Sequence, residues 1–205
     1  MINYINPVSN NTPQSDPNQW LTNSKDKIKY SYNILREEGL SEKEAIAVLG
    51  NIAQESKFDH TVKSNSGYRG LVQLSGPRYN HYQSYLKINK LPDSMENQVR
   101  YIARTIVNPD LAQKHWSTMK GLSIFRNNPT VKNFATFYEG TNNALDKRSN
   151  YSNIINTMRT TDNWDEPEKT TIDLPQQLIQ QPDKTRVSTP MINNNNNNLI
   201  DFINQ

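Results

Sequence analysis

The stretch from Ser41 to Tyr79 constrains the fold most, because a strongly marked helix leads directly into a glycine-rich loop. Ser41 and Glu44 have the spacing of a capping box, in which each side chain bonds the other residue's backbone N–H. Apolar residues then recur on one face of the predicted helix, at Ala45, Val48, Leu49, Ile52 and Ala53. Turn-forming residues crowd 59–78. The stretch therefore predicts a buried helix whose last turn, which holds Glu55, opens onto a loop.

Helical periodicity recurs through the middle of the chain, with little strand signal. Apolar spacing and stop signals predict further helices at 24–38, 79–86, 95–107, 111–122, 130–138 and 143–159. Residues 68–74 fit either a short strand or a tight loop. We therefore expect an all-α domain of six to seven short helices, with a small loop or hairpin after the central helix.

Composition divides the chain into four parts. Residues 1–19 are rich in Asn, Pro and Ser and predict a flexible N-terminal arm, and residues 20–160 form the helical body. Residues 161–198 are polar, end in six consecutive Asn and predict a linker. Residues 199–205 are apolar again, which suggests a docking peptide or a segment that folds back on the body.

Several classes of protein are disfavoured by what the sequence lacks. It has no cysteine, and His60, His81 and His115 do not have the spacing of metal ligands, so neither metal nor organic cofactor is expected. No apolar run approaches the ~18 residues of a membrane span. The first residues show neither the basic nor the apolar region of a signal peptide, so we expect none. The glycines at 67, 70 and 76 do not form a phosphate-binding loop.

Charge is unevenly distributed along the chain. Residues 20–160 carry 20 Lys and Arg against 12 Asp and Glu, whereas residues 161–205 carry 3 against 7. A basic body suits a polyanionic partner such as nucleic acid, a membrane surface or a bacterial cell wall. The same charges, spread along the body, also fit an ordinary solvated surface.

Glu55 is a candidate for chemistry because of its place on the central helix. It lies three residues after Ile52 and seven after Val48, on the flank of the apolar stripe. A carboxylate there is partly removed from water, as a general acid requires. On this pattern alone, a surface Glu in a last helical turn is the competing interpretation.

Specific residues around Glu55 resemble the phage tail lysozyme family, whose lysozyme-like helical fold is shared with soluble lytic transglycosylases and goose-type lysozymes. The similar segments are GNIAQESKF at 50–58, GY at 67–68, GLVQ at 70–73 and RY at 78–79. A distal match comprises Phe134, Glu139, Ala144, Arg148 and Tyr151, so the resemblance covers roughly residues 22–158. The chain departs from the family at Leu74, where Trp is usual, and at His60, where Pro is frequent.

The resemblance implies a virion-associated peptidoglycan hydrolase that opens the bacterial cell wall during phage genome entry. It would cleave the β-1,4 bond between N-acetylmuramic acid and N-acetylglucosamine, with Glu55 as general acid. A second carboxylate would be Glu139 or Asp59. Glu139 could instead bond Arg148 or end a helix, and Asp59 could shape the turn. Hydrolysis and anhydro-forming transglycosylation both remain open.

Residues of the loop would line the substrate cleft in this interpretation: Ser66, Tyr68, Gly70 and Gln73. The expected partners are bacterial peptidoglycan and other virion proteins, bound through the C-terminal peptide. The alternative is a catalytically weak or inactive structural virion protein that uses its lysozyme-like body for wall binding or assembly. Nucleic acid is the least favoured partner.

Overall fold

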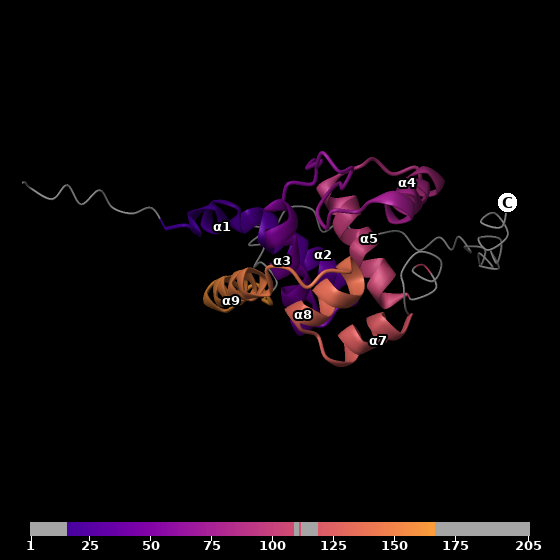
Figure 1. The fold of residues 1–205 in the computed structure, drawn as a ribbon. Coiled ribbons are helices and arrows are strands. Elements are labelled where there is room, and N and C mark those ends of the chain that lie inside the picture. Colours follow the sequence, from indigo (N-terminus) through magenta and orange to yellow (C-terminus); the bar gives the residue numbers. More distant parts are fainter. Residues whose placement is uncertain (1–15, 109–110, 112–118, 167–205) are drawn as a thin grey trace, which may run out of the picture. The chain divides into compact units, whose positions relative to one another are not determined.

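Helices form the whole framework of the described chain (Figure 1), as the periodicity predicts. The computed structural model describes residues 16–108, 111 and 119–166, which belong to a compact unit formed by residues 1–167. Within these residues the elements are α1 (Gln19–Asn23), α2 (Lys25–Glu37), α3 (Glu42–Ser56), α4 (Gly76–Asn89), α5 (Met95–Val107), α7 (Met119–Asn127), α8 (Val131–Phe134), the π-helical turn η1 (Ala135–Glu139) and α9 (Leu145–Thr161). The all-α prediction is confirmed.

Helix α3 is the central element and begins where its sequence predicts. Ser41 Oγ accepts a hydrogen bond from Glu44 N at 3.3 Å, and Glu44 Oε2 accepts one from Ser41 N at 2.6 Å. Most of α3 is buried, and it packs extensively against α9. At the crossing, a Cβ on Gly50 would lie 2.8 Å from both Arg148 O and Ser152 Cβ. Glycine at this position therefore lets α9 approach α3 closely.

Helices α2 and α5 pack against one another and are joined by ion pairs at their exposed edge. Glu38 accepts hydrogen bonds from Arg100 Nη1 at 2.9 Å and from Arg104 Nε at 2.8 Å. Ser94 caps α5 by accepting from Asn97 N at 3.2 Å. Since α2 also contacts α3, this side of the unit supports the helix that carries Glu55.

Some helix boundaries differ from those predicted. Helix α4 starts at Gly76 and not at Tyr79, because Pro77 occupies a first-turn position, where its missing N–H is no loss. Helix α9 runs two residues later than the predicted 143–159. The predicted helix 111–122 falls mostly on residues 112–118, outside the described residues, and α7 begins at Met119.

The segment between α3 and α4 is a tight loop with two isolated bridges and no strand in this described region. Arg69 pairs with Lys63 on one side and with Leu74 on the other. Lys57 and Phe58 both have positive φ, which turns the chain sharply away from α3 directly after Glu55. The loop therefore starts beside the candidate acid.

The packed chain continues past residue 160. Trp164, within the predicted linker 161–198, is buried at 4% exposure, and its ring lies 5.7 Å from that of Tyr32. Residues 1–15 of the predicted arm, the linker after Glu166 and the predicted docking peptide 199–205 lie outside the described residues. Across the part of the chain that is described, no helix combines the length and apolar character that a membrane span needs.

Candidate active site

Glu55 lies in the last turn of α3 and is held by Arg148 of α9. Arg148 Nη2 donates to Glu55 Oε1, although the two residues are far apart in sequence. The side chain of Glu55 is 22% exposed, whereas that of Arg148 is 2% exposed. One side of the Glu55 carboxylate therefore contacts the buried guanidinium of Arg148, and the other side reaches solvent.

Arg148 also binds three further groups, so its guanidinium is fixed in place. Its Nη1 donates to Asn51 Oδ1 at 2.7 Å and to Glu139 Oε2 at 2.6 Å. Its Nε donates to Asn143 O at 3.0 Å. Asn51, one turn before Glu55, is itself anchored by a bond from its Nδ2 to Ala47 O at 2.8 Å. We call Asn51, Glu55, Glu139 and Arg148 the Arg148 cluster.

Glu139 is the buried carboxylate of the Arg148 cluster. It is the last residue of the π-helical turn η1, a turn type that is frequent at functional sites. Its side chain is 4% exposed, and its Oε1 has no hydrogen-bond partner among the described residues. Burial raises the pKa of Glu139 to about 8; the positive charge of Arg148 opposes this rise, and the negative charge of Glu55 adds to it.

Two carboxylates therefore share one guanidinium. With both carboxylates ionised, the Arg148 cluster would carry a net negative charge in a largely buried place, which is costly. Because the pKa of Glu139 is raised to about 8, Glu139 retains its proton near neutral pH and adds no second negative charge beside Glu55. Of the two carboxylates, Glu55 is the one that reaches solvent.

A second buried arginine lies next to the Arg148 cluster. Arg78, near the start of α4, donates through Nη1 to Glu139 O at 3.3 Å, and its guanidinium lies 5.5 Å from the ring centroid of Tyr138. Burial lowers the pKa of Arg78. Tyr138 Oη lies 3.0 Å from Thr105 Oγ1 on α5. The turn that carries Glu139 is thus tied to α4 and α5 as well as to α9.

The four predicted substrate-binding residues lie on the loop, and none of them forms a hydrogen bond to the Arg148 cluster within the described residues. Ser66 and Tyr68 are exposed, with Tyr68 at 45%. Gln73 has a positive φ of 50° and donates from Nε2 to Gly70 O at 2.9 Å. Gly70 is buried, and a Cβ there would lie 2.4 Å from Gln98 Oε1. The structure thus brings Glu55 and Glu139 together and gives Gly70 a packing role.

The other carboxylate considered, Asp59, shapes the turn after α3. Asp59 Oδ1 accepts from Thr61 N at 2.8 Å and from Thr61 Oγ1 at 2.6 Å, and these bonds lower the pKa of Asp59. Leu74, where the resemblance leads one to expect Trp, is 5% exposed and belongs to the core. It therefore offers no exposed face to a sugar ring.

The sequence pattern missed the bond between Arg148 and Glu55 and the part played by Asn51. The i to i+4 spacing of Asn51 and Glu55 would have placed them on one helix face, but no local signal connects that face to Arg148. In the described ranges, no group of three or more His, Asp or Glu residues is placed to hold a metal ion.

One of the three comparisons with known proteins gives a match. The family model for phage tail lysozyme matches residues 26–158, which include all four members of the Arg148 cluster. Neither the curated proteins nor the solved structures contain a match. This match supports a phage peptidoglycan hydrolase, that is, a glycosidase in general terms. From residue 26 to residue 158 the chain belongs to the phage tail lysozyme family.

Proposed function

We propose that this protein is a virion-associated peptidoglycan hydrolase that cleaves the β-1,4 bond between N-acetylmuramic acid and N-acetylglucosamine, with Glu55 as general acid. The observation that carries the proposal is the Arg148 cluster, in which two carboxylates share one buried guanidinium. Family membership supplies the substrate class.

Glu55 is a better general acid than Glu139 because it reaches solvent. Its side chain is 22% exposed, against 4% for Glu139. A general acid must approach the leaving oxygen within hydrogen-bonding reach, which a carboxylate closed inside the protein does not. Glu139, with its pKa raised to about 8, holds its own proton near neutral pH and so adds no second negative charge beside Glu55. Glu55 is the member of the two that a substrate can reach.

The reaction starts with transfer of the Glu55 proton to the glycosidic oxygen as the C1–O bond breaks. The leaving sugar takes that proton as a hydroxyl, and Glu55 becomes a carboxylate. Arg148 already touches Glu55, so it stabilises the negative charge that appears there without rearrangement. In hydrolysis, water then adds at C1 and gives its proton to the Glu55 carboxylate, which restores the acid. In transglycosylation, the C6 hydroxyl of the same sugar adds at C1, gives its proton to Glu55 in the same way and yields an anhydro product.

The delivery route is also part of the proposal. The protein would be carried in the virion and would act on the host wall during genome entry. Residues 199–205 would bind another virion protein, since an apolar peptide after a polar spacer suits such docking.

A second candidate function has two structural observations in its favour. Arg148 holds Glu55, and Leu74 lies in the core where a ring-stacking Trp is usual, so sugar binding at this subsite is weakened. A structural virion protein that binds peptidoglycan without cutting it would show these features. It predicts wall binding with no release of muropeptides.

The deciding experiment is digestion of purified peptidoglycan followed by mass spectrometry of the soluble products. Wild-type protein is expected to release disaccharide muropeptides, and their ends, reducing or anhydro, identify the route. Glu55→Gln is expected to release none. Glu37→Gln is the matched control, because Glu37 lies 60% exposed in a surface ion pair with Arg100. Wall binding without products from the wild type would favour the structural alternative.

A further inference from the structure

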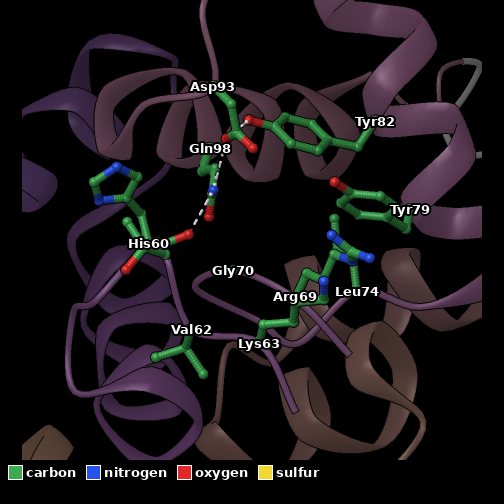
Figure 2. Close-up of a pocket in the computed structure, with 11 residues that line it drawn as sticks. His60, Val62, Lys63, Arg69, Gly70, Leu74, Tyr79, Tyr82, Asp93 and Gln98 are labelled. Atoms are coloured by element: carbon green, nitrogen blue, oxygen red, sulfur yellow. Dashed lines mark hydrogen bonds between the residues drawn. The ribbon is translucent and has the colours of Figure 1, made fainter. Parts of the chain in front are cut away.

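A separate pocket of about 200 Å³ lies between the loop and helices α4 and α5 (Figure 2). Its walls include Lys63, Arg69 and Gly70 from the loop and Tyr79, Asp93 and Gln98 from the helical side. No member of the Arg148 cluster lines it. Pockets for drug-sized ligands are usually larger, about 300–1,000 Å³, so this one fits a small group and not a disaccharide.

Gln98 makes this pocket a fixed structure. Gln98 is 7% exposed. Its Oε1 accepts a hydrogen bond from Leu71 N at 2.9 Å, and its Nε2 donates to His60 O at 3.0 Å and to Asp93 Oδ1 at 2.8 Å. Figure 2 shows Gln98 between His60 and Asp93. A Cβ on Gly70 would lie 2.4 Å from Gln98 Oε1, so the loop backbone rests directly on this amide. The loop is thereby held against α5.

Arg69 is held by the same loop and lies against an aromatic wall. Its backbone N donates to Leu74 O at 2.9 Å, and its O accepts from Leu74 N at 2.8 Å. Its guanidinium lies 5.0 Å from the ring centroid of Tyr79, and the close-up shows the two side chains next to one another. A stacked arginine keeps its planar donor fork oriented and loses little entropy when it binds an anion.

The positive charges at this pocket have no acidic partner in the part of the chain that the structure describes. Within residues 16–108, 111 and 119–166, neither Lys63 nor Arg69 forms an ion pair, whereas ion pairs hold Arg100, Arg104, Arg126, Arg148 and Arg159. The one carboxylate of the pocket, Asp93, accepts from Tyr82 Oη at 2.7 Å and from Gln98 at 2.8 Å, both at Oδ1. The pocket therefore presents two cations to a ligand.

We propose that this pocket binds a carboxylate of the peptide stem of peptidoglycan, so that the enzyme prefers glycan strands that carry peptides. This proposal rests on the proposed function. The stem branches from the muramic acid and bears free carboxylates, which an arginine fork binds bidentately. An extended peptide spans about 3.3 Å per residue, so the stem reaches beyond the glycan that it is attached to. Tyr79 supplies apolar contact for the adjoining side chain.

The test compares two substrates with the full-length protein. Teichoic-acid-free glycan strands are prepared with their peptide stems, or are stripped of them by an amidase. We expect wild type to prefer stem-bearing strands in kcat/KM. Arg69→Gln is expected to reduce this preference about tenfold, as loss of a charge-assisted hydrogen bond predicts. Arg69→Lys should restore part of it. Lys87→Gln removes one exposed positive charge elsewhere on α4 and is the matched control.

The outcomes distinguish failure of the pocket proposal from failure of the proposed hydrolase function. If wild type cleaves both substrates with equal kcat/KM, or if Arg69→Gln keeps the full preference, the pocket proposal is overturned while the hydrolase stands. If wild type cleaves neither substrate, the proposed function has failed. A preference seen only on walls that retain teichoic acid would show that the pocket binds phosphate. That result would also overturn the proposal that the pocket binds a carboxylate of the peptide stem.

A binding measurement covers the case in which Arg69→Gln does not fold. An N-acetylated stem peptide is titrated into the wild-type protein, and backbone amide shifts are followed by NMR. Shifts that saturate at Lys63, Arg69 and Leu74 support the proposal. No shifts there at millimolar peptide, or equal shifts with a peptide whose carboxylates are amidated, overturn it.

Discussion

The buried carboxylate Glu139 makes stability depend on pH in a direction that can be tested. Its pKa is raised from 4.5 to about 8, so between these values the folded state holds a proton that the unfolded state has lost. The free energy of unfolding therefore falls as pH rises through this window. At about 1.4 kcal/mol per pH unit, the loss reaches at most ~5 kcal/mol. Below pH 4.5 Glu139 is protonated in both the folded and the unfolded state, so its full contribution to stability is present.

Glu139→Gln removes this titration while keeping an oxygen that can accept from Arg148. Urea unfolding, followed by far-UV circular dichroism, gives the free energy of unfolding at a series of pH values. We expect the variant to match the wild type near about pH 5 and to exceed its stability by about 2–5 kcal/mol near pH 8.5. The histidines also titrate in this range, but they are common to both proteins, so the difference isolates Glu139.

Parallel pH profiles would refute this reasoning. If the difference between Glu139→Gln and wild type stays constant from about pH 5 to pH 8.5, Glu139 has an ordinary pKa and stays ionised beside Arg148 and Arg78. Glu139 would then carry a negative charge beside Glu55 near neutral pH, and its proposed role as a neutral neighbour of the acid would be lost.

Three further changes test the framework around the site. Arg148→Met removes the buried donor that Asn51 and Glu139 share and leaves their buried oxygens without it, so it should cost about 3–5 kcal/mol of stability in thermal unfolding at neutral pH; an unchanged Tm would show that the Arg148 cluster does not contribute to stability. Gly50→Ala forces a Cβ against Arg148 O and Ser152 and should cost about 1–3 kcal/mol, measured by urea unfolding, unless α9 moves away without penalty. Ser41→Ala removes the N-cap of α3 and should cost about 1 kcal/mol by the same measurement, and no loss would mean that water caps the helix equally well.

Helix starts were predictable where the signal is a local side-chain bond. Ser41 with Glu44 is such a signal, and the capping box is present. Gly76 and Pro77 both favour turns, so the sequence pattern places them in the loop. Yet Pro77 opens α4, since proline suits a first helical turn as well as a turn between elements.

The candidate site was predictable only in part. Periodicity places Glu55 on the flank of the buried stripe, and the structure shows it at the boundary between core and solvent. Periodicity does not show a π-helical turn, because the extra residue in η1 breaks the 3.6-residue repeat that the prediction relies on. It also does not pair Arg148 with Glu55 or set Gly70 against Gln98, since both contacts depend on how helices pack.

The role of Glu55 as general acid is tested most directly by the muropeptide yield of Glu55→Gln on purified peptidoglycan, measured by mass spectrometry beside the wild type and the Glu37→Gln control. We expect products from the wild type and the control and no detectable products from Glu55→Gln, with all three proteins folded by circular dichroism. Muropeptide release by Glu55→Gln at the wild-type rate would contradict this role and would place the acid elsewhere.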